Sequence, residues 1–223
     1  MSIARTAPRL VEIYKKLLES RDTKIFVDEV ARHYTAATLD RLLAAGVREA
    51  RRAAALALGY LGNFSSNTVL GRAMNDSDKG VRVLAENSIR HVWHRAGTDD
   101  QNRRLTQLVE LIAADRFEEA ATQATILIEE APEFAECWNQ RAIAWYRLER
   151  YQDAIADCIE ALELNPYHFG AAAGIGQCEL YMGDYRAALL AFRKALELNP
   201  GLENIQANVT FLEQALDCQK PGE

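Results

Sequence analysis

Hydrophobic residues recur every three or four positions along most of the chain, which is the pattern of helices with one buried face. Glycines such as Gly46, Gly62 and Gly97 stand where several of these patterns stop. Runs of β-branched residues are rare and apolar residues make up 49% of the chain, so we predict an all-α fold. In the first part, the predicted helices cover about 8–20, 23–34, 35–46, 47–61, 66–74 and 79–95.

A fixed period organises the second part of the chain. Pro132, Pro166 and Pro200 stand 34 residues apart, and the phrase Leu-Asn-Pro occurs at 164–166 and again at 198–200. Self-similarity at this period indicates stacked helical units, because each unit leaves an apolar face that its neighbour must cover. The same period links two further sets of residues: Phe117, Tyr151 and Tyr185, and Ala120, Ala154 and Ala188.

The residues inside each period resemble the tetratricopeptide repeat, a helix–turn–helix unit. With the proline at position 32, the unit 135–168 has Trp138 at position 4, Ala142 at 8, Trp145 at 11 and Ala154 at 20. The resemblance implies a helical-repeat solenoid in which small residues let the two helices of a unit cross closely. We expect units at 101–134, 135–168 and 169–202, followed by an amphipathic capping helix at 202–217.

Two helices of the first half align with each other at a shift of 31 residues, which places Arg51 on Arg82 and Leu58 on Ile89. The pattern Ala-Arg-x-x-Ala-x-x-Ala-Leu at 50–58 resembles the second helix of a HEAT-like repeat, over about 38–95. In that family, an Asp in the turn between helices and an Arg early in the second helix form a ladder between repeats. The resemblance assigns this ladder to Arg51, Asp76, Asp78 and Arg82.

The net charge of −6 hides an asymmetry that supports a division into two parts. Residues 1–98 carry 16 basic and 10 acidic residues, a net of +6, whereas residues 99–223 carry 10 basic and 22 acidic residues, a net of −12. The sign changes at Gly97-Thr98-Asp99-Asp100, a sequence typical of a turn that caps a helix. We therefore expect HEAT-like repeats with N-terminal capping helices at 1–98 and tetratricopeptide repeats at 99–223.

In tetratricopeptide arrays the first helix of each unit lines a concave groove, so the resemblance implies a peptide-binding groove here. The residues implied to line it in the second and third units are Asn139, Gln140, Ile143, Tyr146, Arg147, Gln177, Leu180 and Tyr181. Some members of the family grip the carboxylates of chaperone C-termini with a clamp of Lys, Asn and Arg. Because Leu105, Val109, Gly170 and Gly174 occupy key clamp positions, we expect no such clamp. The acidic balance favours a neutral or basic partner segment.

We therefore expect a non-catalytic adaptor that binds a protein segment, with no cofactor and no metal. No catalytic motif stands out, and His91 and His94 lack a further ligand nearby that would complete a metal site. Two alternatives stay open. One is nucleic-acid binding by the basic half, which we consider unlikely because aromatic residues for stacking are few. The other is a lyase-type enzyme on the HEAT-like half. The opposite charges of the halves also allow self-association.

The location in the cell is predicted from two features. The N-terminus shows no signal peptide, and the longest apolar run, Ala53 to Gly62, is about half of what spans a bilayer. The four cysteines show no Cys-x-x-Cys pairing and lie on predicted helices, so we expect reduced, buried thiols in a cytoplasmic protein. These are Cys137, Cys158, Cys178 and Cys218.

Overall fold

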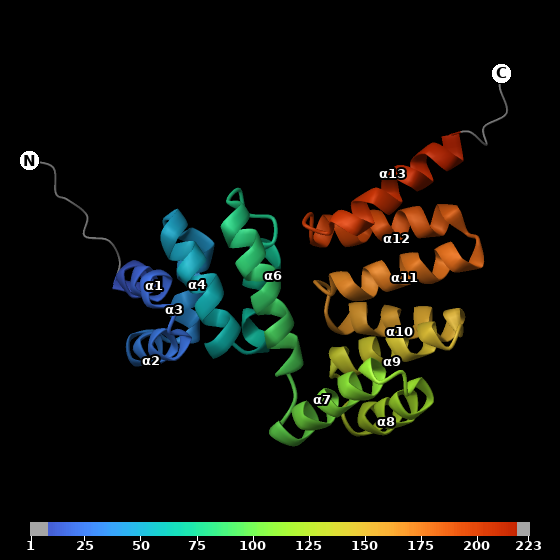
Figure 1. The fold of residues 1–223 in the computed structure, drawn as a ribbon, viewed down its shortest axis with the longest axis horizontal. Coiled ribbons are helices and arrows are strands. Elements are labelled where there is room, and N and C mark those ends of the chain that lie inside the picture. The colour runs from blue at the N-terminus through green and yellow to red at the C-terminus, as the bar shows by residue number, and fades with distance from the viewer. Residues whose placement is uncertain (1–8, 218–223) are drawn as a thin grey trace, which may run out of the picture. The chain divides into compact units, whose positions relative to one another are not determined.

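The computed structural model describes residues 9–217, and its regular elements within that range are all helices (Figure 1). The chain divides into two compact units, the first ending at Trp93 and the second beginning at His94. The first unit holds α1 (Arg9–Ser20), α2 (Thr23–His33), α3 (Ala36–Ala45), α4 (Arg48–Leu61), the short 3-10 helix η1 (Phe64–Ser66), α5 (Asn67–Ala73) and α6 (Lys79–His94). The second holds α7 (Asp99–Ala113), α8 (Phe117–Glu130), α9 (Ala135–Arg147), α10 (Tyr151–Leu164), α11 (Phe169–Met182), α12 (Tyr185–Leu198) and α13 (Glu203–Asp217).

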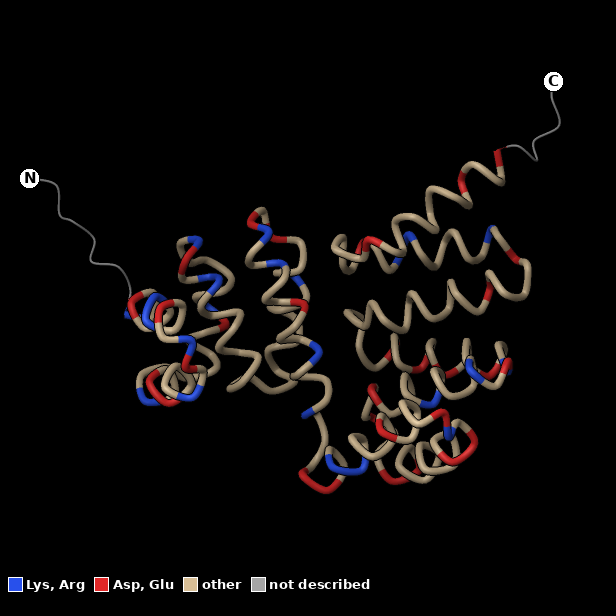
Figure 2. The backbone as a smooth tube through the Cα atoms, in the orientation of Figure 1, with Lys and Arg blue, Asp and Glu red and all other residues tan. Residues whose placement is uncertain are grey.

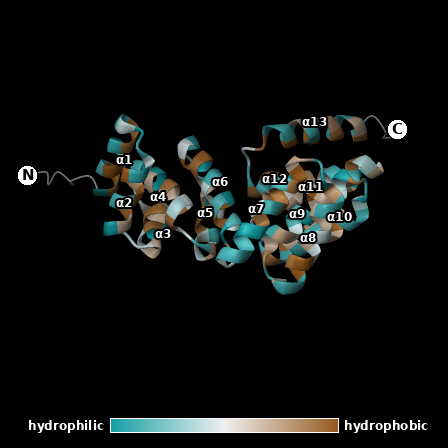
Figure 3. Ribbon diagram, turned by 60° about the horizontal axis from the view of Figure 1, so that its bottom comes forward, coloured by the Kyte–Doolittle hydropathy of each residue, from teal (hydrophilic) through white to brown (hydrophobic). Residues whose placement is uncertain are grey.

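The all-α prediction is confirmed, and the helices of the first unit begin and end close to the predicted positions. The Asp22 side chain accepts the amide of Ile25 to cap α2, and Gly46 and Gly62 follow the ends of α3 and α4. Small residues bring α4 and α6 together, because a Cβ placed on Gly59 would come within 2.6 Å of Ser88 Oγ. Brown and teal residues alternate along these helices in Figure 3, as expected for elements with one buried face.

The 34-residue period of the second unit corresponds to a pair of antiparallel helices joined by a short turn. Each of the three periodic prolines lies two residues beyond the end of α8, α10 or α12. The repeated Leu-Asn-Pro phrase also has a local reason: Asn165 Oδ1 accepts the amide of Tyr167, and Asn199 Oδ1 accepts the amide of Gly201. The asparagine therefore shapes the turn while the proline prevents the helix from continuing.

The turns inside each pair also repeat. Asp115, Glu149 and Gly183 stand 34 residues apart, and all three have positive φ values, of 56°, 60° and 84°. Glycine adopts this left-handed conformation without steric cost, whereas Asp and Glu adopt it at a small cost in energy. The shared backbone geometry shows that α7–α8, α9–α10 and α11–α12 are three copies of one unit, although their turn residues differ.

The helices of the second unit form two layers. In the first layer α9 packs directly against both α7 and α11, while α8, α10 and α12 form the second layer behind it. α13 packs against α12, and its Val209 and Leu212 share a buried cluster with Leu180 of α11. α13 therefore extends the first layer and covers the apolar face of the last pair.

A buried ion pair joins the two layers. The Arg141 guanidinium on α9 donates to both carboxylate oxygens of Asp157 on α10, each at 2.7 Å, and to Thr125 Oγ1 on α8 at 3.0 Å. Its carbon Cζ also lies 5.0 Å from the centre of the Trp138 ring. One side chain thus connects three successive helices, and the sequence pattern alone did not single it out.

Candidate functional site

Four equivalent side chains, three of them apolar, form a row across the exposed face of the first layer. Val109, Ile143, Gln177 and Phe211 occupy the same position of α7, α9, α11 and α13, because they stand 34 residues apart. Ile143 is 36% exposed and Phe211 is 62% exposed, and Val109 and Gln177 are partly buried. We call these four residues the groove row. Phe211 was not among the expected groove residues, although its spacing from Gln177 could have indicated it.

Three tyrosines gather at one end of this face. Tyr146, Tyr151 and Tyr181, which we call the tyrosine cluster, have ring centres 5.6–5.9 Å apart. Tyr151 and Tyr181 are nearly parallel, at 18°, while the Tyr146 ring is tilted against both. Tyr181 is 60% exposed. The structure therefore brings the expected groove residues Tyr146 and Tyr181 together, and adds Tyr151 from the start of α10.

Arg147, the one cation among the expected groove residues, already binds other side chains of this unit. Its guanidinium donates to Asp115 Oδ1 at 2.9 Å and lies 4.4 Å from the centre of the Phe117 ring. Both partners belong to the preceding helix pair. Arg147 therefore connects two repeats, and releasing it to a ligand would break these contacts.

Asn139 and Gln140 belong to a buried polar network on the inner part of the same face. Their amide groups donate to Glu136 Oε1 at 3.1 and 2.7 Å, and Glu136 is only 4% exposed. His168 Nδ1 accepts the amide of Ala171, which leaves Nε2 to donate to Glu136 Oε2 at 3.1 Å.

The network keeps Glu136 ionised. It also uses an N–H donor of each side-chain amide, that of Asn139 and that of Gln140. Burial by itself would raise the pKa of Glu136, but the hydrogen bond and electrostatic attraction of His168, the attraction of His94 and the hydrogen bond from Gln140 outweigh it and hold that pKa below its usual value. Asn139 and Gln140 are themselves 9% and 8% exposed. The structure thus places these two expected groove residues mainly inside the fold, where they bind Glu136, whose bond to His168 joins α9 to the start of α11.

The positions of a carboxylate clamp hold no cation in this structure. Leu105 is completely buried, Val109 belongs to the groove row, and Gly170 and Gly174 have no side chain. Elsewhere in residues 99–217, eight of the nine basic residues lie in intramolecular ion pairs, and only Arg186 has none. Figure 2 shows α11 almost without charge, apart from Glu179. The second unit therefore presents mainly negative and apolar groups.

In the first unit, the four residues of the expected ladder lie close together. Arg51 donates to both oxygens of Asp76 at 2.7 and 2.8 Å and to the Gly46 carbonyl oxygen at 3.1 Å. Arg82 donates to the carbonyl oxygen of Asp76 at 2.9 Å. Asp78 pairs with Arg52, at 2.7 Å for each of two bonds, a partner that the sequence alignment did not identify. These bonds lower the pKa of Asp78 to about 2.

The other candidate groups offer no metal or nucleophile site within residues 9–217. The His91 ring packs against Tyr60, with ring centres 6.4 Å apart, and those residues contain no group of three metal-ligating side chains. Cys137, Cys158 and Cys178 are buried and free, as predicted, and burial raises the pKa of Cys137 to about 12. A thiol with a raised pKa is a weak nucleophile. Cys218 lies outside the described residues. Within the described helices none is long and apolar enough to cross a membrane.

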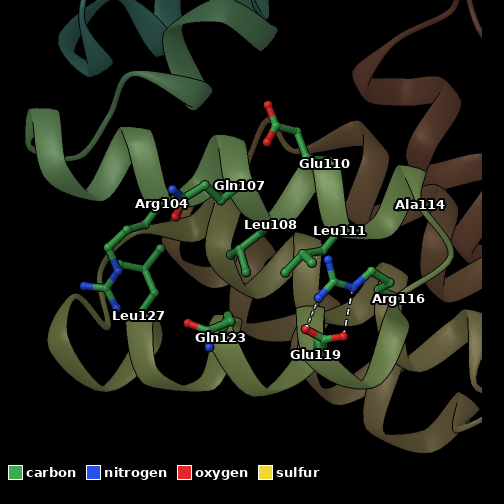
Figure 4. Close-up of a pocket in the computed structure, with 10 residues that line it drawn as sticks. All are labelled: Arg104, Gln107, Leu108, Glu110, Leu111, Ala114, Arg116, Glu119, Gln123 and Leu127. Atoms are coloured by element: carbon green, nitrogen blue, oxygen red, sulfur yellow. Dashed lines mark hydrogen bonds and ion pairs between the residues drawn. The ribbon is translucent and has the colours of Figure 1, made fainter.

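A pocket of about 500 Å³ lies between α7 and α8 (Figure 4). Its floor is apolar, with Leu108 and Leu127 buried. The guanidinium of Arg116 donates to Glu119 at 2.8 Å across one end, and Arg104 pairs with Glu130 near the other. Both arginines of the pocket are thus engaged in ion pairs.

Comparison with family models identifies the second unit's repeats. Residues 135–168 and residues 170–202 each match the tetratricopeptide repeat. These segments correspond to α9–α10 and α11–α12, so the prediction of tetratricopeptide repeats is confirmed for them.

Curated relatives match the repeat region. The chain is 33% identical over 103 residues to the Hsp70-Hsp90 organizing protein of Triticum aestivum, and the match covers 46% of this chain and 18% of that protein. It is 27% identical over 141 residues to a TPR repeat-containing protein of Rhizobium etli, covering 63% of this chain and 68% of that protein. It is 32% identical to the SGT1 homolog of Bos taurus, covering 46% and 30%. The wheat and bovine proteins are therefore much longer than the matched region.

Solved structures share the fold. The first TPR domain of Spaghetti (RPAP3), bound to the HSP90 peptide SRMEEVD, superposes with a TM-score of 0.52 at 21% identity, covering 54% of this chain and 96% of that one. The Sgt2 TPR domain from Aspergillus fumigatus gives a TM-score of 0.52 at 19% identity, covering 57% and 89%. At these identities the likeness concerns the fold.

Proposed function

We propose that this chain is a non-catalytic adaptor that binds a segment of another protein across the exposed face of α7, α9, α11 and α13. The observation that carries the proposal is the groove row, with Ile143 and Phe211 exposed beside the tyrosine cluster. Exposed apolar and aromatic side chains that line up on one face are typical of protein–protein interfaces. The names of the relatives, which include an organizing protein for two chaperones, support a role in protein interactions.

The geometry of the row favours an extended ligand. Packed helices lie about 8–10 Å apart, and a polyproline II segment has three residues per turn and advances about 3.1 Å per residue. Every third side chain of a segment extended in this way would therefore face a successive member of the groove row. Such a ligand could place apolar side chains against Val109, Ile143 and Phe211, with Gln177 available for a hydrogen bond.

We propose that the partner segment is neutral or basic. The similar domain in the solved complex holds an acidic peptide, SRMEEVD. In this chain the clamp positions carry Leu105, Val109, Gly170 and Gly174, and Arg147 is engaged with Asp115. An acidic segment would meet a surface with excess negative charge and few available cations, which would disfavour its binding.

For the first unit we propose HEAT-like repeats, supported by the bonds of Arg51 to Asp76 and to the Gly46 carbonyl oxygen. Because Arg51, Arg52 and Arg82 are engaged in the fold, nucleic-acid binding by this half is not favoured. The first unit then serves as a second interaction surface or a spacer. The buried thiols agree with our proposal that the protein works in the reducing cytoplasm.

A selection from a random-peptide phage library tests the proposal. The full chain and two double variants serve as bait: Ile143→Asp with Phe211→Asp on the groove row, and Ile159→Asp with Leu190→Asp on the second layer. The control pair is matched, because Ile159 and Leu190 are 44% and 68% exposed, close to the 36% and 62% of the groove pair. Circular dichroism checks that all three baits are equally helical.

We expect the wild-type chain and the control variant to enrich the same peptides, and the groove variant to lose them. The peptides should be neutral or basic. Equal enrichment by both variants, or enrichment by none of the baits, would contradict the proposal. Enrichment of acidic peptides would contradict the proposed charge of the partner while leaving the groove in place.

A further inference from the structure

The tyrosine cluster presents an open aromatic face next to the groove row. Tyr151 and Tyr181 are stacked with their centres 5.6 Å apart, and Tyr181 is 60% exposed, so a large part of its ring surface is accessible. Burial and a hydrogen bond between the hydroxyls of Tyr146 and Tyr181 raise the pKa of Tyr146. The Tyr146 hydroxyl therefore stays protonated at neutral pH. The faces of the aromatic rings are electron-rich.

The surroundings of the cluster are negative. Tyr146 and Tyr181 lie in the last turns of α9 and α11, where the helix dipole contributes partial negative charge. The exposed Glu149 lies two residues beyond the end of α9, and after burial its charge is the next cause of the raised pKa of Tyr151. A positive group placed on the cluster would therefore gain from both the rings and these charges.

Cations already lie over aromatic rings elsewhere in this unit. Arg147 Cζ is 4.4 Å from the centre of the Phe117 ring, and Arg150 Cζ is 3.9 Å from the centre of the Trp145 ring. Each of these arginines also pairs with a carboxylate, Asp115 or Asp153. The tyrosine cluster has the same combination of ring and carboxylate, but among residues 9–217 no basic side chain of this chain lies over it.

We propose that the tyrosine cluster receives a cationic side chain of the bound segment, an arginine in preference to a lysine. The guanidinium lies flat on the open face of Tyr181, and Glu149 supplies the counter-charge. Arginine is preferred because its planar, weakly hydrated group stacks on aromatic faces, whereas the lysine ammonium is compact and strongly hydrated. This inference rests on the proposed function, since the same segment occupies the groove row.

The test uses the peptides retrieved by the wild-type chain in the phage selection. Each is resynthesised with every arginine replaced in turn by citrulline, which has nearly the same shape without the charge. Binding to the full chain is measured by fluorescence anisotropy for wild type, Tyr181→Leu and Tyr181→Phe. Tyr60→Leu is the matched control, because it makes the same change at an exposed tyrosine of the first unit. Glu149→Gln tests the counter-charge.

We expect one citrulline position to raise the Kd for wild type about threefold to thirtyfold, the range expected for a cation on an aromatic ring. That penalty should disappear in Tyr181→Leu, persist in Tyr181→Phe and Tyr60→Leu, and shrink in Glu149→Gln. A penalty of equal size in wild type and Tyr181→Leu would overturn the inference, because the cation would then bind elsewhere. Peptides that bind the groove without arginine or lysine would overturn it while leaving the proposed function intact. The absence of any selected peptide would overturn both.

Discussion

Replacement of Gly176 by alanine tests how closely α11 and α12 approach each other. A Cβ at this position would lie 2.5 Å from Cδ1, 2.6 Å from Cε1 and 2.9 Å from Cγ of Phe192. Phe192 is completely buried and belongs to a cluster with Ala188, Val209 and Leu212. The ring cannot move away without displacing its neighbours, so the new methyl group must overpack the core.

The magnitude follows from two opposing effects. Overpacking a well-packed core costs about 1–3 kcal/mol, while replacing a helical glycine by alanine gains up to about 1 kcal/mol. We therefore expect Gly176→Ala to lower the free energy of unfolding by about 1–2 kcal/mol. Gly170 is the matched control in the same helix, because its added Cβ would come no closer than 3.4 Å to any side-chain atom. Gly170→Ala should be neutral or slightly stabilising.

Urea unfolding followed by helical circular dichroism measures both variants, and an unchanged slope m shows that the compared states are the same. The double variant with Phe192→Leu provides a second check, since a smaller side chain relieves the clash. The leucine substitution should cost less in the Gly176→Ala background than in wild type. If Gly176→Ala proved as stable as Gly170→Ala, the close packing of α11 on α12 described above would be wrong.

Three further changes test other parts of the structure. Arg141→Leu should lower the free energy of unfolding by about 3–5 kcal/mol because it leaves Asp157 buried without its partner. The double variant Arg141→Leu/Asp157→Leu should recover much of this loss in urea unfolding. No recovery would show that the ion pair between Arg141 and Asp157 is not the cause of the loss. Ionised Glu136 has a lowered pKa in the folded state, so its stabilising contribution is present above its usual value of 4.5 and is lost as the pH falls through the folded-state pKa. Stability of Glu136→Gln, measured by urea unfolding over a pH series, should therefore fall less than that of wild type on acidification; equal losses would exclude this role. Arg51→Met should destabilise the first unit by about 1–2 kcal/mol in a urea titration, because charged hydrogen bonds are lost. The loss should clearly exceed that of Arg48→Met, which removes only an exposed ion pair. Equal losses would show that the ladder contributes little.

The sequence by itself determined the helices and their periodicity. Helix ends depend on residues close in the chain, such as the capping Asp22 or Gly46, so local pattern was enough to place them. The 34-residue period of Pro132, Pro166 and Pro200 likewise reflects a repeated local turn, which is why the tetratricopeptide repeats could be identified without a structure.

Only the tertiary structure decided which polar residues of the expected groove remain available to a ligand. Asn139 and Gln140 turned out to be committed to Glu136, which binds His168, 32 residues further along the chain. Arg147 is likewise committed to Asp115 from the preceding pair. The choice between binding a ligand and binding a neighbouring helix depends on which groups the packing brings within about 3 Å, and sequence spacing does not contain that information.

The assembly of the tyrosine cluster shows both contributions. Tyr146 and Tyr181 could be placed on one face from their positions in the repeat, because α9 and α11 are the first helices of successive repeats. Tyr151 begins a different helix, and only the crossing of α9, α10 and α11 brings its ring against the other two. The periodic sequence thus determines which side chains share a helix face, while the angles and distances between packed helices determine which of them meet.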